Sequence, residues 1–186
     1  MIIAEGKLKG VFEIDLEPHE DHRGCFMRTY DTKIFRTYGL HQDWVQENQS
    51  YSKKKGTVRG LHFQFPPHAE TKLVRVVSGE VYDVVVDLRK GSATFGKWDS
   101  FRLSADNKKM VYIPRGFAHG MCTLTDDSNM LYKVDSYYAP ESEGAIKWDD
   151  PDIKISWPVE NPIITEKDSR AKGFKEFVKA FEGLEV

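Results

Sequence analysis

Four side chains spread along the chain have the chemistry needed to move a proton beside a carbonyl group. They are an imidazole, an ammonium, a phenol and a carboxylate, at His62, Lys72, Tyr132 and Asp168. Groups of these four kinds are the ones needed to remove and return a proton beside a carbonyl. Spacing alone does not assemble these residues, and a single strand histidine is more often a hydrogen-bonded core residue. They form a hypothesis that the fold has to support.

Two short motifs stand out, G-L-H-F-Q at residues 60–64 and P-R-G-F-A-H at residues 114–119. The second has the form P-x-G-x-x-H, which resembles a motif of the cupin superfamily, small jelly-roll barrels that bind ligands in the barrel mouth. Metal-binding cupins carry H-x-H in their first motif, where this chain has His62-x-Gln64. An amide oxygen is a poor substitute for imidazole on a transition metal, and His62 with His119 alone leaves a metal site incomplete. We therefore expect no metal.

Short strands are the elements that would position these residues. Residues 71–77 and 80–87 are β-branched runs separated by Ser78-Gly79, which predicts a hairpin with a tight turn. Further strands are predicted at 57–64, 97–104, 110–113, 117–124 and 129–138. In the last of these, Tyr132 and Tyr138 share parity, so both face the interior if the strand is regular. Many short strands with turn signals predict a β-sandwich or barrel.

Helix is expected in only two places. Residues 31–38 predict a short helix capped by Asp31 and stopped at Gly39. Near the C-terminus, apolar residues recur at i, i+3, i+4 and i+7, at Phe174, Phe177, Val178 and Phe181. This stripe predicts a helix that docks on the barrel. The expected fold is mostly β, with a few short helices.

Composition indicates an ordinary globular protein. A chain of 186 residues suits one domain, residues 1–186, and its net charge of −2 gives no electrostatic reason to expect nucleic acid or an anionic membrane as a partner. Cys25 and Cys122 form no CxxC pair, so we expect free thiols. No signal peptide and no apolar run of membrane-spanning length is visible, which favours the cytoplasm.

Seven stretches in one order give the chain a specific resemblance. They are D-x-R-G-x-F (21–26), V-Q-E-N-Q-S (45–50), V-R-G-L-H-F-Q (58–64), K-L-V-R-V-V (72–77), D-V-V-V-D-L-R (83–89), I-P-R-G-F-A-H-G (113–120) and W-D-D-P (148–151). Together with Lys167-Asp168, they resemble the nucleotide-sugar epimerases of the dTDP-4-dehydrorhamnose 3,5-epimerase family. The likeness covers nearly the whole chain.

The resemblance implies a homodimeric cupin-type jelly roll that inverts carbon 3, carbon 5 or both in a nucleoside-diphosphate 4-keto-6-deoxy sugar. His62 matches the base, and Asp168 the carboxylate that orients it. Lys72 matches the lysine beside the keto oxygen, and Tyr132 the acid on the opposite face. No cofactor is implied, because the ketone itself acidifies the adjacent C–H bond.

The resemblance also implies a set of substrate-binding residues. Cationic groups would neutralise the diphosphate, amides would hydrogen-bond the ligand, and one tyrosine would stack on the base. The set is Arg23, Phe26, Arg28, Gln46, Asn48, Arg59, His119, Tyr138, Glu143 and Lys167. Without the resemblance, the charged members would be interpreted as solvated surface residues and Tyr138 as a core aromatic.

One position departs from the family pattern. Arg28 stands where the rhamnose-pathway members usually carry glutamate, which replaces a hydrogen-bond acceptor by a cationic donor. Either the preferred base is changed, giving for example a mono-epimerase that acts on a GDP- or CDP-linked sugar, or Arg28 is a tolerated variant. A second class of function is a cupin that binds a sugar nucleotide without catalysis.

Overall fold

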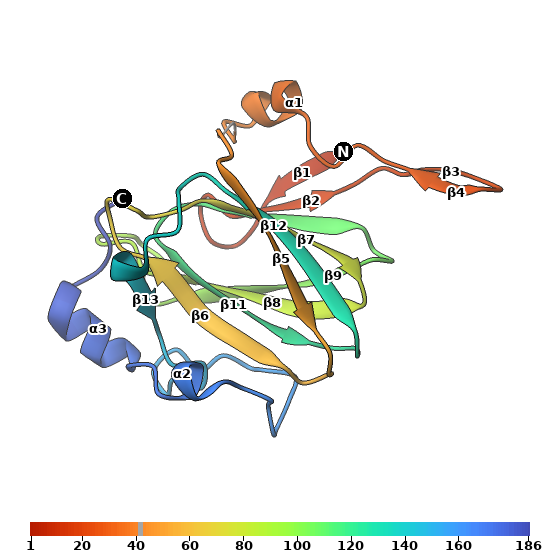
Figure 1. The fold of residues 1–186 in the computed structure, drawn as a ribbon. Coiled ribbons are helices and arrows are strands. Elements are labelled where there is room, and N and C mark those ends of the chain that lie inside the picture. Colours follow the sequence, from red (N-terminus) through yellow and green to blue (C-terminus); the bar gives the residue numbers. More distant parts are fainter. Residues whose placement is uncertain (41–42) are drawn as a thin grey trace.

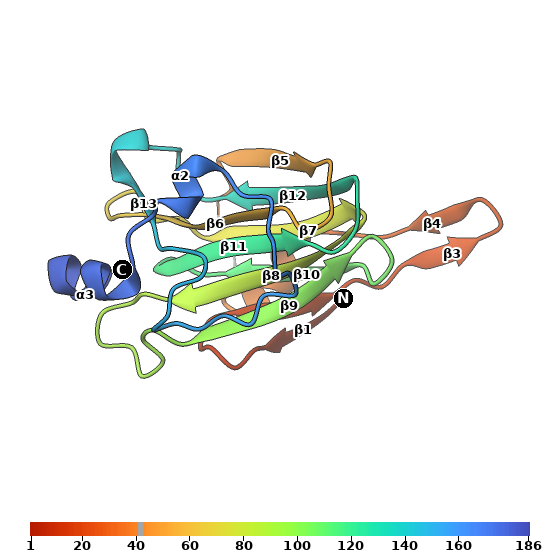
Figure 2. The same cartoon turned by 90° about the horizontal axis from the view of Figure 1, so that it is seen from below.

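Two antiparallel β-sheets face each other in the computed structural model, which describes residues 1–40 and 43–186 (Figures 1 and 2). The six-stranded sheet has the order β1 (Ile2–Glu5), β2 (Phe12–Asp15), β10 (Lys109–Ile113), β7 (Lys72–Ser78), β12 (Ser128–Val134) and β5 (Gln46–Ser52). The five-stranded sheet has the order β13 (Glu143–Ala145), β6 (Val58–Gln64), β11 (Phe117–Thr123), β8 (Glu80–Asp87) and β9 (Trp98–Ser104). The predicted mostly β fold is confirmed; among the described strands, no ladder closes the two sheets into one barrel.

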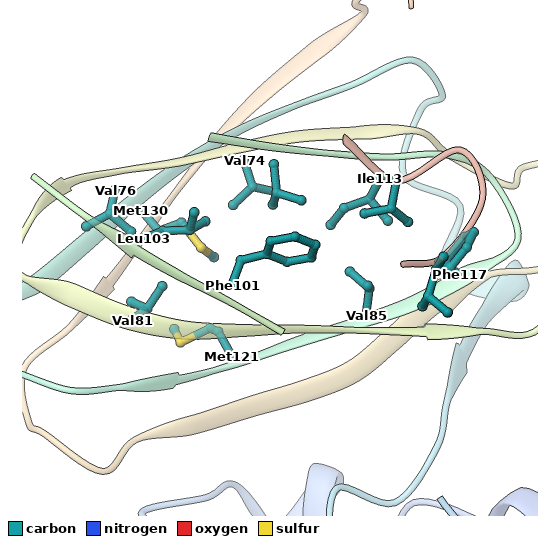
Figure 3. Packing of buried hydrophobic residues seen from close by; sticks show 13 residues of the cluster. Val74, Val76, Val81, Val85, Phe101, Leu103, Ile113, Phe117, Met121 and Met130 are labelled. Atoms are coloured by element: carbon teal, nitrogen blue, oxygen red, sulfur yellow. The ribbon is translucent and has the colours of Figure 1, made fainter. Parts of the chain in front are cut away.

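An apolar core fills the space between the sheets. Val74 and Val76 of β7 point into it from one sheet, and Val81 and Val85 of β8 from the other (Figure 3). The ring of Phe101 from β9 lies among them (Figure 3). Because successive side chains of a strand point to opposite faces, the residues that share parity with these valines also point between the sheets. The remaining residues of each strand pack on the outer faces.

The hairpin predicted for residues 71–87 does not form. β7 pairs with β10 and β12, whereas β8 pairs with β11 and β9, so the chain crosses from one sheet to the other at Ser78-Gly79. Gly79 has a φ of +74°, and a Cβ there would lie 2.5 Å from Thr125 Oγ1. A β-branched run indicates burial but not which strand it pairs with, and this is why the sequence pattern misled. The connection is an arch between sheets.

The other predicted strands are confirmed with one change at an end. β6, β9, β10 and β11 lie within one residue of their predicted bounds. The strand predicted at 129–138 is β12, which ends at Val134. Tyr138 therefore lies beyond the strand, and the parity argument that placed it in the interior does not apply to it.

Both predicted helices are confirmed. Helix α1 spans Thr32–Thr37, and the Asp31 side chain caps it by accepting hydrogen bonds from the backbone N–H groups of Lys33 and Ile34. Helix α3 spans Phe174–Phe181 and buries Phe177 against the outer face of the five-stranded sheet. Two short helical segments, η1 (Pro140–Ser142) and α2 (Glu166–Ser169), lie between them. No helix in the described part of the chain is long and apolar enough to cross a membrane.

A small two-stranded hairpin stands apart from the two sheets. It consists of β3 (His19–Asp21) and β4 (Gly24–Phe26), and it protrudes from the body in both views (Figures 1 and 2). All six residues of its strands are exposed, and Phe26 exposes 70% of its surface. The strands of this hairpin therefore bury none of their side chains in the body of the protein.

The two cysteines are free thiols, as expected. Cys25 is exposed on the protruding hairpin and Cys122 is buried in β11. Burial raises the pKa of the Cys122 thiol to about 11, because the thiolate would lose its hydration. Cys122 is therefore an unreactive thiol at neutral pH.

Candidate active site

A cavity of about 320 Å³ lies between the two sheets and contains all four predicted catalytic residues. β6 and β11 contribute residues from the five-stranded sheet, β7, β12 and β5 from the six-stranded sheet, and α2 with the residue before it closes one side. The lining residues are Ser50, Arg59, His62, Lys72, His119, Gly120, Met121, Met130, Tyr132, Thr165, Lys167 and Asp168. Residues separated by more than a hundred positions thus meet in one site.

His62 and Asp168 form a hydrogen-bonded pair. His62 Nε2 lies 2.7 Å from Asp168 Oδ1, and the Asp168 side chain is only 5% exposed. The second oxygen of Asp168 accepts a hydrogen bond from the buried backbone N–H of Gly60 at 3.3 Å. Thr165 caps α2 by accepting a hydrogen bond from the backbone N–H of Asp168. The carboxylate is therefore fixed in place before it contacts the imidazole.

A second imidazole–carboxylate pair faces the same cavity. His119 of β11 lies directly opposite His62 of β6 in the strand register. Its Nε2 is 2.7 Å from Oδ2 of Asp83, which is fully buried in β8. Within residues 1–40 and 43–186, Asp83 Oδ1 has no hydrogen-bond partner. Because a buried carboxylate needs hydrogen-bond partners, the contact between His119 and Oδ2 offsets part of the cost of burying Asp83.

Close packing of the backbone at Gly60 brings the two histidines side by side. A Cβ at Gly60 would lie 2.6 Å from the carbonyl oxygen of His119, closer than a side chain allows. The register between β6 and β11 shifts between His119 and Met121, within β11. A glycine at position 60 is thus required for the approach of β6 to β11.

The opposite wall of the cavity presents a cation and a phenol. Lys72 of β7 and Tyr132 of β12 both point inward, and Lys72 Nζ lies 5.7 Å from the centre of the Tyr132 ring. Lys72 Nζ also contacts Glu70 Oε1 at 2.5 Å. Burial raises the pKa of the Tyr132 phenol, and the charge of Glu70 raises it further, while Arg59 acts in the opposite direction. Tyr132 therefore keeps its proton well above neutral pH.

A chain of polar contacts extends from the cavity to other predicted binding residues. Lys167, which lines the cavity, holds Glu143 by contacts of 2.7 and 2.8 Å. The hydrogen bond from Lys167 lowers the pKa of Glu143, and the same bond raises the pKa of Lys167. The hydroxyl of Tyr138 donates to Glu143 at 3.3 Å, and the backbone N–H of Tyr138 donates to Gln46 at 2.8 Å. These residues form one wall beside the cavity.

Tyr138 is the correction in this group. It does not point into the interior, because β12 ends four residues earlier and 59% of Tyr138 is exposed. Its exposed ring lies instead on the wall beside the cavity.

Two other predicted binding residues lie at or near the cavity. Asn48 lies on β5, opposite Tyr132 in the strand register. Arg59 lines the cavity and donates to Ser52 Oγ and to the carbonyl of Tyr51.

Three predicted binding residues lie elsewhere in this chain. Arg23 and Phe26 belong to the protruding hairpin, and Arg28 follows it. Arg23 pairs with Asp21 at 2.6 Å, and Arg28 pairs with Asp31 at 3.3 Å. Arg23, Phe26 and Arg28 do not line the cavity that holds His62. The structure therefore separates this group from the catalytic candidates.

Gln64, at the position where metal cupins carry their second histidine, is engaged in structural hydrogen bonds. It is 4% exposed, accepts a hydrogen bond from the backbone N–H of Ala139 at 2.7 Å, and donates to the carbonyl of His68 at 2.9 Å. Its amide also contacts Glu70 Oε2 at 3.4 Å. Gln64 thus ties the loop after β6 to the segment after β12.

Glu70 and Asp83 were not predicted from the sequence, although both carboxylates pair with residues that line the cavity. Asp83 has a signal that was available, because it alternates with Val81 and Val85 and so shares their inward parity. Glu70 precedes its strand, so parity gives no guide to its direction. Its proximity to Lys72 depends on the turn at residues 65–71, which the sequence does not define.

Size alone does not identify the site. A hollow of about 720 Å³ lies between β13 and α3 and is larger than the cavity around His62. Its floor is formed by phenylalanine rings, among them Phe63, Phe65 and Phe181. It contains none of the four predicted catalytic residues. The smaller cavity has the acid–base groups, and chemistry is the better criterion.

Known proteins resemble this chain over most of its length. A family model described as dTDP-4-dehydrorhamnose 3,5-epimerase matches residues 5–176. A protein of that name from Shigella flexneri is 48% identical over 175 residues, which cover 94% of this chain and 96% of that protein.

Solved structures agree with the sequence matches. An epimerase from Legionella pneumophila, in complex with dTDP-4-keto-L-rhamnose, is 37% identical, has a TM-score of 0.92, and is matched over 100% of this chain and 98% of that one. A 3'-monoepimerase from Streptomyces bikiniensis, in complex with dTDP-quinovose, is 31% identical with a TM-score of 0.89, over 97% of this chain and 91% of that one.

Proposed function

The chain belongs to the dTDP-4-dehydrorhamnose 3,5-epimerase family, and we propose on that basis that it inverts carbon 3, carbon 5 or both in a dTDP-4-keto-6-deoxyglucose-type sugar. The reaction is part of deoxysugar and surface-polysaccharide biosynthesis. The observation that carries the mechanism is the cavity in which the His62–Asp168 pair faces Lys72 and Tyr132 from the opposite sheet. The proposal takes residues 1–186 as one epimerase domain.

His62 is the proposed base. Its Nε2 is occupied by Asp168, so Nδ1 is the nitrogen that removes a proton from the carbon beside the ketone. The electron pair of the broken C–H bond forms a C=C bond, and the carbonyl electrons move to oxygen to give an enolate. The Asp168 carboxylate stabilises the positive charge that the imidazole ring acquires.

Lys72 and Tyr132 complete the proposed cycle from the other sheet. The Lys72 ammonium stabilises the enolate oxygen, where negative charge develops. Tyr132 delivers its phenolic proton to the face of the sugar opposite His62, which inverts the centre. The phenolate then regains a proton from solvent, and His62 releases its proton to solvent, so the protein returns to its starting state. The raised pKa of Tyr132 keeps the acid protonated before each turnover.

The nucleotide half of the substrate is assigned to the wall beside the cavity. Arg59 and Lys167 are cations at the cavity and suit the diphosphate. Gln46 and Asn48 of β5 supply amides, and the exposed ring of Tyr138 is available for stacking on the base. His119 supplies a further contact to the sugar, and the Asp83 carboxylate fixes its ring.

A homodimer would give a substrate-binding role to three residues that lie outside the cavity, Arg23, Phe26 and Arg28. They are matched to substrate binding by family resemblance, yet they lie on or next to the protruding hairpin and not at the cavity of their own chain. In a homodimer, the hairpin of one subunit would reach the cavity of its partner and place Phe26 against the nucleotide. This arrangement also explains the exposed aromatic ring. The two free thiols favour the reducing cytoplasm as the location.

Deuterium exchange tests the function. Incubation of the enzyme with dTDP-4-keto-6-deoxyglucose in deuterated water is expected to place solvent deuterium at carbon 3, carbon 5 or both, measured by NMR. His62→Ala lowers the exchange rate by about a hundredfold or more, while nucleotide-sugar binding measured by calorimetry persists. His68→Ala removes a half-exposed histidine outside the cavity and leaves exchange unchanged.

The same experiment decides between the alternatives. Absence of exchange with the dTDP, GDP and CDP versions of the sugar would sink the proposal, and binding without exchange would make the protein a non-catalytic sugar-nucleotide binder. A rate that is highest with the dTDP version would make Arg28 a tolerated variant of the glutamate that the family usually carries. Exchange at one carbon only, or a faster reaction with GDP or CDP, would identify the mono-epimerase alternative.

A further inference from the structure

We infer that Glu70 is a positioning residue for Lys72 and Tyr132 and that it fixes the upper end of the pH range in which the enzyme works. The inference rests on the proposed function, because it assumes that Tyr132 is the acid. Glu70 does not line the cavity and has no part in the mechanism above. It lies behind Lys72, on the turn between β6 and β7.

The contact between Glu70 and Lys72 is short and largely withdrawn from water. Lys72 Nζ lies 2.5 Å from Glu70 Oε1, and the two side chains are 10% and 13% exposed. A buried ammonium requires a compensating group, because its loss of hydration is costly. Glu70 supplies that compensation and so determines where the Lys72 ammonium points, which is over the Tyr132 ring.

Glu70 is itself held in place from the other side. Its second oxygen, Oε2, accepts a hydrogen bond from the Gln64 amide at 3.4 Å. Gln64 is fixed in turn by the backbone of Ala139 and His68. One carboxylate oxygen thus faces Lys72 and the other faces Gln64. The Lys72 contact is the shorter of the two and mainly sets the position of the carboxylate, because the Gln64 amide also donates to the carbonyls of His68 and Tyr137.

Several charged groups lie near Tyr132, and the negative charge of Glu70 is the one that raises the pKa of the phenol. Burial raises the pKa of Tyr132 first, Glu70 raises it further, and Arg59 lowers it. The other charged or titratable groups that line the cavity with Tyr132 are His62 of β6, Lys72 of β7, His119 of β11, and Lys167 and Asp168 of α2. Glu47, Arg75 and Lys133 alternate with the inward-facing residues of their strands and lie on the outer face of the six-stranded sheet. Removing the Glu70 charge leaves the buried Lys72 ammonium uncompensated beside the phenol, which favours the phenolate.

The charge of Glu70 affects catalysis through the protonation state of Tyr132. Tyr132 donates a proton and is active only while protonated. A negative neighbour disfavours the phenolate, so Glu70 keeps the acid form to a higher pH. Without that charge the phenol ionises at a lower pH, and the basic limb of the kcat profile moves to lower pH with it.

Glu70→Gln is the test, because glutamine keeps the shape and an oxygen that accepts a hydrogen bond from Lys72. On the basic limb of the kcat profile, the variant's rate relative to its own maximum is expected to fall about threefold below the wild type at the same pH. Glu141→Gln is the matched control. It removes an exposed carboxylate, 73% accessible, from the nearby 3₁₀ turn, and the basic limb stays in place.

A direct titration separates this inference from the proposed function. Tyrosinate absorbance is followed against pH in proteins with and without Tyr132→Phe, so that the difference reports Tyr132 alone. In the Glu70→Gln background the midpoint of that difference moves to lower pH. An unchanged midpoint would overturn the role of Glu70 even in an active epimerase, and a moved midpoint with an unmoved basic limb would overturn its link to catalysis. Loss of all exchange in the wild type would refute only the proposed function.

Discussion

At the scale of single residues, the two histidines at the cavity are oriented by carboxylates that do not themselves react with the substrate. Asp168 fixes one nitrogen of His62, and the backbone N–H of Gly60 fixes Asp168. Asp83 does the same for His119 from inside the five-stranded sheet. The reacting groups are thus oriented before substrate arrives, which is the condition for efficient proton transfer.

Asp168→Asn is expected to lower kcat by about a hundredfold or more with little change in KM. The amide keeps the size of the side chain, but its N–H₂ group can turn toward Nε2 and favour the tautomer with a proton on Nδ1, the nitrogen that has to accept one. Steady-state kinetics on the keto sugar measure the effect. Asp149→Asn is the control, because Asp149 is a half-exposed residue paired with Lys147 outside the cavity. A kcat within tenfold of the wild type would refute the role of Asp168.

Most residues of the candidate site could be predicted from the sequence, because many family-like motifs surround them. His62, Lys72, Tyr132 and Asp168 were identified together because the family-like stretches around them occur in one order. Their proximity in one cavity depends on the tertiary structure and cannot be derived from their spacing in the sequence. Glu70 was not predicted, because the direction of its side chain depends on an irregular turn and on its contact with Gln64. The role of Gln64 follows from its hydrogen-bond partners, which the sequence does not specify.

At the scale of elements, the arch between β7 and β8 decides which groups face each other. If the two strands had formed a hairpin, they would lie in one sheet as neighbours. Because the chain crosses at Ser78-Gly79, Lys72 stands on one sheet and the Asp83–His119 pair on the other. Gly79 makes the crossing possible, since its φ is +74° and its neighbours leave no room for a Cβ.

Gly79→Ala is expected to destabilise the fold by about 2 kcal/mol or more, the sum of a left-handed backbone and a steric clash with Thr125 and Ser128. Chemical denaturation measures the change. Gly91→Ala is the matched control, because Gly91 has the same φ of +74° with nothing within 4 Å of the added Cβ. It isolates the backbone cost of about 1 kcal/mol. Equal losses in the two variants would show that crowding at the arch is unimportant.

The elements themselves were predicted well and their partners were not. Local signals defined α1, because the cap at Asp31 and the stop at Gly39 act within a few residues. Strand signals defined where β6 to β12 begin, since alternation reports burial. Pairing between strands depends on contacts between distant residues, which explains both the wrong hairpin at 71–87 and the strand that ended at Val134, before Tyr138.

At the scale of the whole molecule, one chain holds two groups of predicted substrate-binding residues that do not meet. The group around His62 lies between the sheets, and the group of Arg23 and Phe26 lies on the protruding hairpin (Figure 1). A homodimer that exchanges hairpins would unite them, so each site would draw on two subunits.

Mixing two inactive variants tests this arrangement. His62→Ala lacks the base, and the double variant Arg23→Ala, Phe26→Ala lacks the hairpin contacts. In mixed dimers one of the two sites has both a normal base and a normal hairpin, so the mixture regains activity above either variant alone, measured by deuterium exchange after subunit exchange. If each site uses the hairpin of its own chain, mixing restores nothing. Mixing His62→Ala with Asp168→Asn is the control and also restores nothing, because those residues share one chain's cavity.

The apolar core between the sheets separates the proposed proton acceptor from the proposed proton donor. His62 is anchored to one sheet and Tyr132 to the other, so the distance between proton acceptor and proton donor depends on the apolar layer that holds the sheets apart (Figure 3). Phe101 and Leu103 belong to this layer and are not cavity residues, but the same layer includes Met121 and Met130, which line the cavity. Substitutions in this layer are therefore expected to change the spacing of acceptor and donor, and with it the stereochemical outcome, with every catalytic residue unchanged.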